Sequence, residues 1–184
     1  MVANCIRFAQ EEVRRKEETE PLLTEYRFGS NKSCKLRIND ENVYITGIID
    51  RVDLIKSTNT IKIIDYKSGS TYGYDVLSNK NAPLINEKSV QPILYYLALK
   101  ELSKSNPDGK VFNSISEAEY YFVTEKGEYE KIRIDFTRFS EEEIINELGN
   151  LVAEIKKGYF MKNEKSNCKY CEYADSCRYK GGEF

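Results

Sequence analysis

Residues 47–53 read Gly-Ile-Ile-Asp-Arg-Val-Asp, and residues 63–69 read Ile-Ile-Asp-Tyr-Lys-Ser-Gly. Both stretches are rich in β-branched residues, and Ser57-Thr58-Asn59 between them is typical of a turn, so we expect a β-hairpin. Isoleucines occupy adjacent as well as alternate positions, which makes both strands apolar on both faces. That pattern is typical of strands in the interior of a sheet.

Each strand of this hairpin carries an acidic residue within its apolar run. Side chains alternate between the two faces of a strand, so Asp65 and Lys67 point to the same side. If the strands pair, Asp50 and Asp65 can share a divalent metal, with the backbone carbonyl of Tyr66 as a further oxygen ligand of the kind that Mg²⁺ prefers. The alternative is that both acids pair with Arg51 and Lys67 on a solvated face. A charge in a central strand needs a function or a close partner.

The composition excludes several classes of function. The chain has 184 residues, 40% of them hydrophobic, which suits one domain with a substantial core. It has no histidine, so the serine triad, the cysteine–histidine dyad and the histidine-rich zinc hydrolases are excluded within it. A net charge of −2 argues mildly against binding nucleic acid by bulk electrostatics, but not against an enzyme that receives DNA from a partner.

The sequence shows no membrane or secretion signal. No run of about 18 apolar residues is present, so we expect no membrane span. The first residues become polar and charged almost at once, unlike a signal peptide. We therefore expect a cytoplasmic protein.

The order of elements predicts a mixed α/β (α+β) fold in which helices flank a central mixed sheet. We expect helices at residues 5–20, 89–103 and 140–158, and strands at 25–28, 35–38, 43–55, 61–67, 118–124 and 129–134. Pro21 is expected to end the first helix, Ser89 to cap the second, and Ser140 with Glu143 to form a capping box on the third. Residues 70–89 are polar and are expected to form a mobile loop beside the hairpin.

Three cysteines lie close together near the end of the chain. Cys168, Cys171 and Cys177 have the spacing C-x₂-C-x₅-C, which is typical of ligands to zinc or to an iron–sulfur cluster. Five cysteines in a chain without a secretion signal make disulfides a poor explanation. Cys5 is the candidate fourth ligand by position. Cys34 is expected to be a packed or exposed free thiol.

The two strand motifs resemble those of the PD-(D/E)XK nuclease superfamily, specifically its RecB-like branch. Gln91-Pro-Ile-Leu-Tyr95 is similar to the QxxxY motif on the helix that follows the catalytic strands in that branch. The resemblance implies a restriction-endonuclease-like core that uses Mg²⁺ or Mn²⁺. It implies that Asp50 and Asp65 are metal ligands and that Lys67 is the catalytic lysine. It also implies that Gln91 and Tyr95 line the active site and contact DNA or the metal-bound water.

The resemblance also implies a biological role. It covers about residues 22–180 and is similar to the C-terminal nuclease domain of AddB-type helicase–nucleases. Those proteins hydrolyse DNA phosphodiester bonds, so we expect a deoxyribonuclease, an exonuclease in DNA repair and recombination that works with a helicase subunit or domain. The alternatives are a CRISPR adaptation-type nuclease and a non-catalytic domain for DNA binding or assembly. Tyr72 and Tyr74, beside the hairpin, are candidate DNA-stacking residues.

Two family features are missing from the N-terminal region. Many members carry a histidine or glutamate on a helix before the first strand; here only Glu11, Glu12, Glu17 or Glu18 could substitute. The first cluster cysteine of the family lies in a Cys-Pro segment, whereas Cys5 is followed by Ile6. We therefore expect residues 1–184 to be a single RecB-like nuclease domain from a longer protein, with a core at about 22–160 and a cysteine-rich tail at 161–184.

Three further charged residues have weaker assignments. Arg51 and Asp53 match the family pattern, and we expect them to form a salt bridge that braces their strand. Glu25, on the first strand, is a candidate for a supporting role near the site.

Overall fold

The computed structural model describes residues 2–29, 34–78, 84–86, 88–105, 112 and 114–159. The chain divides into two compact units, residues 1–148 and 149–184. None of the helices in these ranges has the length and apolarity needed to cross a bilayer.

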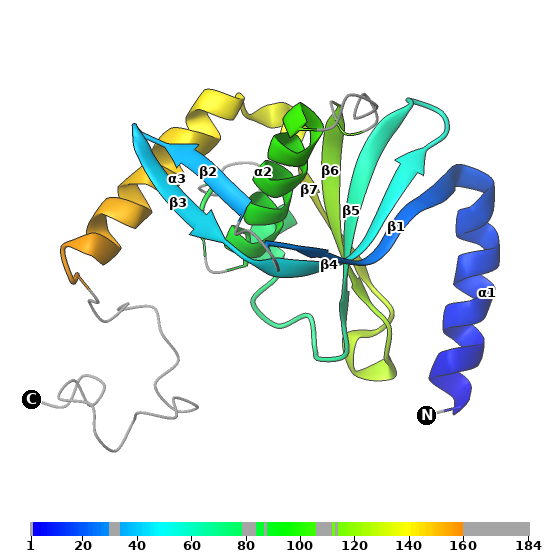
Figure 1. The fold of residues 1–184 in the computed structure, drawn as a ribbon. Helices are drawn as coiled ribbons and strands as arrows, with labels where there is room; N and C mark the ends of the chain where they lie inside the picture. The colour runs from blue at the N-terminus through cyan, green and yellow to red at the C-terminus, as the bar shows by residue number, and fades with distance from the viewer. Residues whose placement is uncertain are drawn as a thin grey trace, which may run out of the picture. The chain divides into compact units, whose positions relative to one another are not determined.

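The first unit is built on a five-stranded sheet with strand order β1-β4-β5-β6-β7, and a separate two-stranded sheet pairs β2 with β3 (Figure 1). The helices are α1 (Val2–Glu18), α2 (Val90–Ser105) and α3 (Glu141–Lys156), and the strands are β1 (Thr19–Phe28), β2 (Cys34–Ile38), β3 (Glu41–Ile45), β4 (Gly47–Ile55), β5 (Thr60–Lys67), β6 (Ile115–Phe122) and β7 (Lys131–Asp135). Short 3₁₀ helices are η1 (Asp75–Ser78), η3 (Glu125–Gly127) and η4 (Phe136–Arg138).

The predicted fold class is confirmed, and so is the central hairpin. β4 and β5 pair antiparallel and occupy interior positions in the sheet. Ile49, Ile61, Ile63 and Ile64 are at most 1% exposed, which explains why these strands are apolar on both faces. β5 then pairs with β6 in parallel, and α2 lies between these two strands in the chain, as parallel strands require a long crossover.

The N-terminal helix ends earlier than predicted. α1 stops at Glu18, and Pro21 lies inside β1 instead of ending the helix. Proline is tolerated there because β1 is an edge strand, where a missing amide donor breaks no ladder on the open side. The register with β4 shifts between Pro21 and Leu23, which accommodates the ring.

The predicted single strand at residues 43–55 is wrong, because it consists of two strands in different sheets. β3 ends at Ile45 and β4 begins at Gly47, so Thr46 separates the two strands. Gly47, the first residue of β4, is required at this point. A Cβ atom on Gly47 would lie 2.6 Å from Cζ of Phe28, so only glycine lets that ring pack against the start of the strand.

The two predicted helix caps have different outcomes. Ser89 does precede α2, but its hydroxyl donates to the Leu84 carbonyl at 2.6 Å and accepts from the Asn86 amide at 2.8 Å. It therefore organises the preceding loop rather than capping the helix. The capping box of α3 is confirmed: the Glu143 amide donates to Ser140 Oγ at 3.1 Å, and the Ser140 amide donates to the Glu143 carboxylate at 2.7 Å.

The two faces of the sheet are covered by different helices (Figure 1). Alternation along β5 and β6 places Asp65 and its neighbour Tyr120 on one face, and the Tyr120 hydroxyl donates there to the Lys88 carbonyl just before α2. Glu119 points to the other face, where Arg15 of α1 donates to it at 2.7 Å. α1 and the Asp65 side chain therefore lie on opposite sides of the sheet.

The α1 face buries several charges. Glu119 is 2% exposed and contacts Arg15 and Lys62, the latter at 3.3 Å. Asp53 is 0% exposed and is held by Arg51 at 2.6 Å and by the Thr19 hydroxyl at 2.8 Å. Buried charges are stable only when they are paired in this way, so this network fixes α1 to β4, β5 and β6.

We expect Glu119→Gln to destabilise the protein by about 3 kcal/mol at pH 7, because it leaves Arg15 short of a buried partner. Burial acts to raise the pKa of Glu119, but the charges of Arg15 and Lys62 outweigh it and hold the pKa below its usual value of 4.5. The stabilisation is therefore complete above that pH and is lost as the pH falls through the folded-state pKa. Urea unfolding at several pH values measures it.

The matched control is Glu130→Gln, which removes an exposed carboxylate. A loss of stability no larger than that of this control, or one that stays constant into acid, would contradict the expected role of Glu119.

Candidate active site

The candidate site lies where β4 and β5 stop pairing. Their backbone register ends at Arg51 and Ile64, one residue short of Asp50 on β4 and of Asp65 on β5. Beyond this point the Tyr66 amide donates to Asp50 Oδ2 at 2.8 Å. The Asp50 carboxylate thus accepts a hydrogen bond from the backbone of β5. This bond holds the carboxylate in place at the point where the two strands separate.

The Asp65 carboxylate is buried and lies against Lys67. Its residue is 4% exposed, and Oδ2 lies 2.5 Å from Lys67 Nζ. Burial raises the pKa of Asp65; Lys67 opposes this, and the negative charge of Asp50 adds to it. A buried acid beside a second carboxylate is suited to a divalent cation.

Helix α2 brings the predicted glutamine and tyrosine to Lys67. Lys67 Nζ donates to Gln91 Oε1 at 3.3 Å, and Gln91 Nε2 donates to Tyr95 Oη at 2.8 Å. Burial raises the pKa of Tyr95 despite the bond from Gln91, and the charges of Asp65 and Asp50 raise it further, so the hydroxyl stays protonated. Asp65, Lys67, Gln91 and Tyr95 are therefore connected side chain to side chain, and Asp50 joins them through the Tyr66 amide.

Two aromatic residues that the sequence did not single out support this group. Lys67 Nζ lies 5.0 Å from the centroid of the Tyr120 ring, a cation–π contact beneath the site. The Phe28 ring meets Tyr95 edge to face at 6.0 Å, and Gly47 makes room for that ring. Tyr120 is one of two tyrosines in β6. Only its position opposite Asp65 on β5 distinguishes it from Tyr121, and no sequence signal marks that position.

The donor set fits Mg²⁺ or Mn²⁺. Within the described ranges, no three His, Cys, Asp or Glu side chains gather as a metal-holding group. Water and a backbone carbonyl would therefore complete the coordination of a cation held by Asp50 and Asp65. The carbonyl of Tyr66 remains the sequence-based prediction. Mg²⁺ usually binds through one or two carboxylates and keeps several waters. The observation that favours a cation here is the closeness of two carboxylates, because the negative charge of Asp50 raises the pKa of the buried Asp65.

The acidic residues of α1 do not reach the two aspartates. Glu12 accepts from Arg51 on the opposite face of the sheet, and Glu11 contacts Arg14 and Lys131 there. Neither residue substitutes for the upstream family acid in this arrangement. The reason is that α1 docks through the buried charges behind the hairpin.

Glu25 of β1 lies beside Asp50 in the strand register, unlike Glu11 and Glu12. Its neighbours Thr24 and Tyr26 pair with Arg51 and Ile49, which puts Glu25 level with Asp50 on the adjacent strand. Its φ of 48° is left-handed, and the residue is exposed. A carboxylate at this position faces solvent at the edge of the sheet.

The two candidate DNA-stacking tyrosines differ in their surroundings. Tyr72 is 78% exposed, so its ring is free to meet a base. Tyr74 is packed edge to face against Tyr120 at 5.0 Å and Phe122 at 5.1 Å. Tyr74 therefore has a packing role in this structure, and Tyr72 is the better candidate for contact with nucleic acid.

The structure describes two of the five cysteines, Cys5 and Cys34. Cys5 is exposed on α1. Cys34 is a buried free thiol, which agrees with the prediction of a packed thiol rather than an exposed one. Cys168, Cys171 and Cys177 lie outside the described residues.

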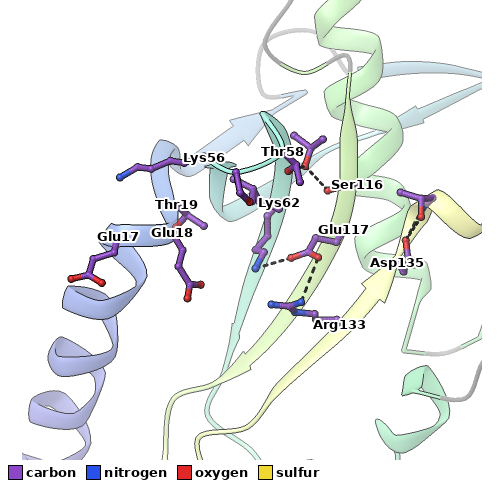
Figure 2. Close-up of a pocket in the computed structure, with 14 residues that line it drawn as sticks. Glu17, Glu18, Thr19, Lys56, Thr58, Lys62, Ser116, Glu117, Arg133 and Asp135 are labelled. Carbon is purple, nitrogen blue, oxygen red and sulfur yellow. Dashed lines mark hydrogen bonds and ion pairs between the residues drawn. The ribbon is translucent and has the colours of Figure 1, made fainter.

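A cavity of about 890 Å³ lies away from the aspartates, on the α1 face (Figure 2). It is bounded by the end of α1, the β4–β5 turn, β6 and β7. Lys62 and Arg133 point toward Glu117 within it, with Lys62 Nζ 2.6 Å from Glu117 Oε1. Because these three residues already form ion pairs with one another, we place the candidate site at the aspartates.

Comparison with known proteins identifies a family. The chain matches the PD-(D/E)XK nuclease superfamily over residues 1–178. A search of curated proteins found no match. A solved structure titled "Crystal structure of SSO0001" is 17% identical, covering 97% of this chain and 70% of that chain, with a TM-score of 0.42.

We expect Asp65→Asn to raise the melting temperature of the metal-free protein at pH 7. Because burial raises the pKa of Asp65, the ionised carboxylate costs the folded state free energy at neutral pH, and neutral asparagine removes that cost. Thermal unfolding in a chelator measures the effect. The control is Asp40→Asn, an exposed turn position with φ of 64°, which asparagine adopts readily. A lower melting temperature for Asp65→Asn would show that the carboxylate serves stability.

Proposed function

Because this chain belongs to the PD-(D/E)XK nuclease superfamily, we propose that it is a RecB-like deoxyribonuclease that hydrolyses DNA phosphodiester bonds. Members of the superfamily are metal-dependent nucleases. The observation that carries the proposal is the connected group of Asp50, Asp65, Lys67, Gln91 and Tyr95 at the separating ends of β4 and β5.

Each residue of the group has a role in this proposal. Asp50 and Asp65 hold Mg²⁺ or Mn²⁺, which lowers the pKa of a bound water and offsets charge on the phosphate. Lys67 places a positive charge beside Asp65 and is aimed by Gln91, so it can orient the attacking water or the phosphate. Gln91 and Tyr95, donors on one face of α2, meet the DNA or the water.

The finer assignment rests on the sequence motifs. The QxxxY pattern at residues 91–95 favours the RecB-like branch, in which such domains act as exonucleases with a helicase in DNA repair and recombination. The net charge of −2 supports delivery of DNA by such a partner, because the chain offers little bulk attraction to phosphate. The exposed ring of Tyr72 supports a contact with single-stranded DNA. A cytoplasmic location accompanies this role.

We expect Asp50→Asn, Asp65→Asn and Lys67→Ala each to lower Mn²⁺-dependent cleavage of linear DNA by about 100-fold or more, the scale of losing one catalytic group. Cleavage of end-labelled single- and double-stranded DNA, read on gels, measures this and separates end from internal cuts. Asp40→Asn is the control and should cleave like the parent chain. Far-UV circular dichroism checks that each variant is folded.

Full cleavage by Asp65→Asn would contradict the assignment of the site. Binding of DNA by the parent chain without cleavage in Mn²⁺ would instead favour the non-catalytic DNA-binding or assembly domain.

We further propose that Cys168, Cys171 and Cys177, with Cys5 as fourth ligand, hold a [4Fe–4S] cluster, with zinc as the alternative metal. The C-x₂-C-x₅-C spacing and the exposed position of Cys5 support this proposal. We expect anaerobically purified protein to contain iron and sulfide in a ratio of about one to one, and Cys5→Ser to lose them. Cys34→Ser is the control. Zinc without sulfide would identify a structural zinc site, and no metal would contradict both forms.

A further inference from the structure

A contact on the α1 face joins β4 and β5 directly behind the two aspartates. Arg51 Nη1 donates to Tyr66 Oη at 3.3 Å. Arg51 follows Asp50 on β4, and Tyr66 follows Asp65 on β5, so each partner is one residue from a carboxylate. The contact spans the region where backbone pairing between the strands has ended. It is therefore a link between the separating strands.

Three further hydrogen bonds hold the Arg51 side of this link. Its Nε and Nη2 donate to the two oxygens of Asp53, at 2.6 and 2.8 Å. Its Nη1 also donates to the Glu12 carboxylate of α1. The planar guanidinium is thus fixed by a fork to Asp53, and Glu12 determines how Nη1 is presented to Tyr66. Arg51 is 8% exposed, so water competes little for these bonds.

The Tyr66 side of the link is held by aromatic packing. The Tyr66 ring meets Phe8 of α1 edge to face at 5.6 Å, and Tyr121 of β6 at 6.0 Å. The same residue donates its backbone amide to Asp50 on the other face of the sheet. A shift of Tyr66 relative to β4 therefore moves the group that holds the Asp50 carboxylate.

We propose that the Arg51–Tyr66 contact, held by Glu12 of α1, sets the spacing of Asp50 and Asp65 and thereby the affinity of the site for a divalent cation. Glu12, Arg51 and the Tyr66 hydroxyl have a positioning role, because these side-chain groups lie on the α1 face and act through the aspartates. The inference rests on the proposed function, in which the two aspartates are the metal ligands.

The coupling has a reciprocal consequence. If docking of α1 favours the spacing that binds a cation, then a bound cation must favour docking of α1 by the same free energy. The amides of α1 should accordingly exchange more slowly when the cation is present. This helix lies on the far side of the sheet, where the cation makes no contact with it.

The experiment measures Mn²⁺ binding by calorimetry to the whole chain without DNA. Tyr66→Phe removes only the hydroxyl and keeps the ring, so we expect intact folding and about fivefold weaker binding, the effect of one hydrogen bond. Glu12→Gln should weaken binding to a similar extent. Glu11→Gln is the control, since Glu11 lies on the same helix but contacts Arg14 and Lys131 instead. It should bind Mn²⁺ like the parent chain.

Hydrogen exchange separates positioning from stability alone. Mn²⁺ should slow exchange along α1 in the parent chain and in Glu11→Gln, and should do so much less in Tyr66→Phe. A residue that acted only on stability would change the melting temperature but leave Mn²⁺ affinity and this response unchanged, and that result would overturn the proposal.

The inference and the proposed function can fail separately. If Asp50→Asn and Asp65→Asn bind Mn²⁺ as the parent does, the assignment of the metal site is wrong. If those two variants lose binding while Tyr66→Phe and Glu12→Gln keep it, the metal site stands and the positioning role is wrong.

Discussion

The bond from the Tyr66 amide to the Asp50 carboxylate is the constraint on which the site depends. It forms where the backbone ladder of β4 and β5 has ended, and it keeps the two strands in register after their main chains part. The opening lets a carboxylate from each strand face the same space, while Ile49 and Ile63 stay buried and hold the rest of the pair together. Stability and the site therefore use different portions of one hairpin.

Buried carboxylates on the two faces of the sheet have different charged neighbours. On the α1 face, Glu119 and Asp53 are buried and each has close basic partners, so their desolvation is offset. On the α2 face, Asp65 is also buried and has Lys67 as a basic partner, but the like charge of Asp50 adds to burial and raises its pKa. Local rules of protein stability are commonly broken at functional sites, and here the exception is the placing of two carboxylates side by side.

Several features followed from local patterns. The apolar runs around residues 47–53 and 63–69 predicted interior strands, and the Ser140–Glu143 spacing predicted the capping box that forms. Predictions failed where a distant contact overrides local preference. Pro21 lies within a strand because β1 is at the edge of the sheet. The predicted strand at residues 43–55 is divided at Thr46 because β3 pairs with β2 in a separate sheet.

The sequence by itself determined the fold class, the central hairpin and the placing of Asp65 and Lys67 on one face of their strand, because a strand alternates with a period of two. Only the tertiary structure decided which side of the sheet α1 covers, where backbone pairing ends, and that Gln91 meets Lys67. Those features depend on contacts between residues far apart in the chain, such as Arg15 with Glu119. No local period of the sequence encodes them.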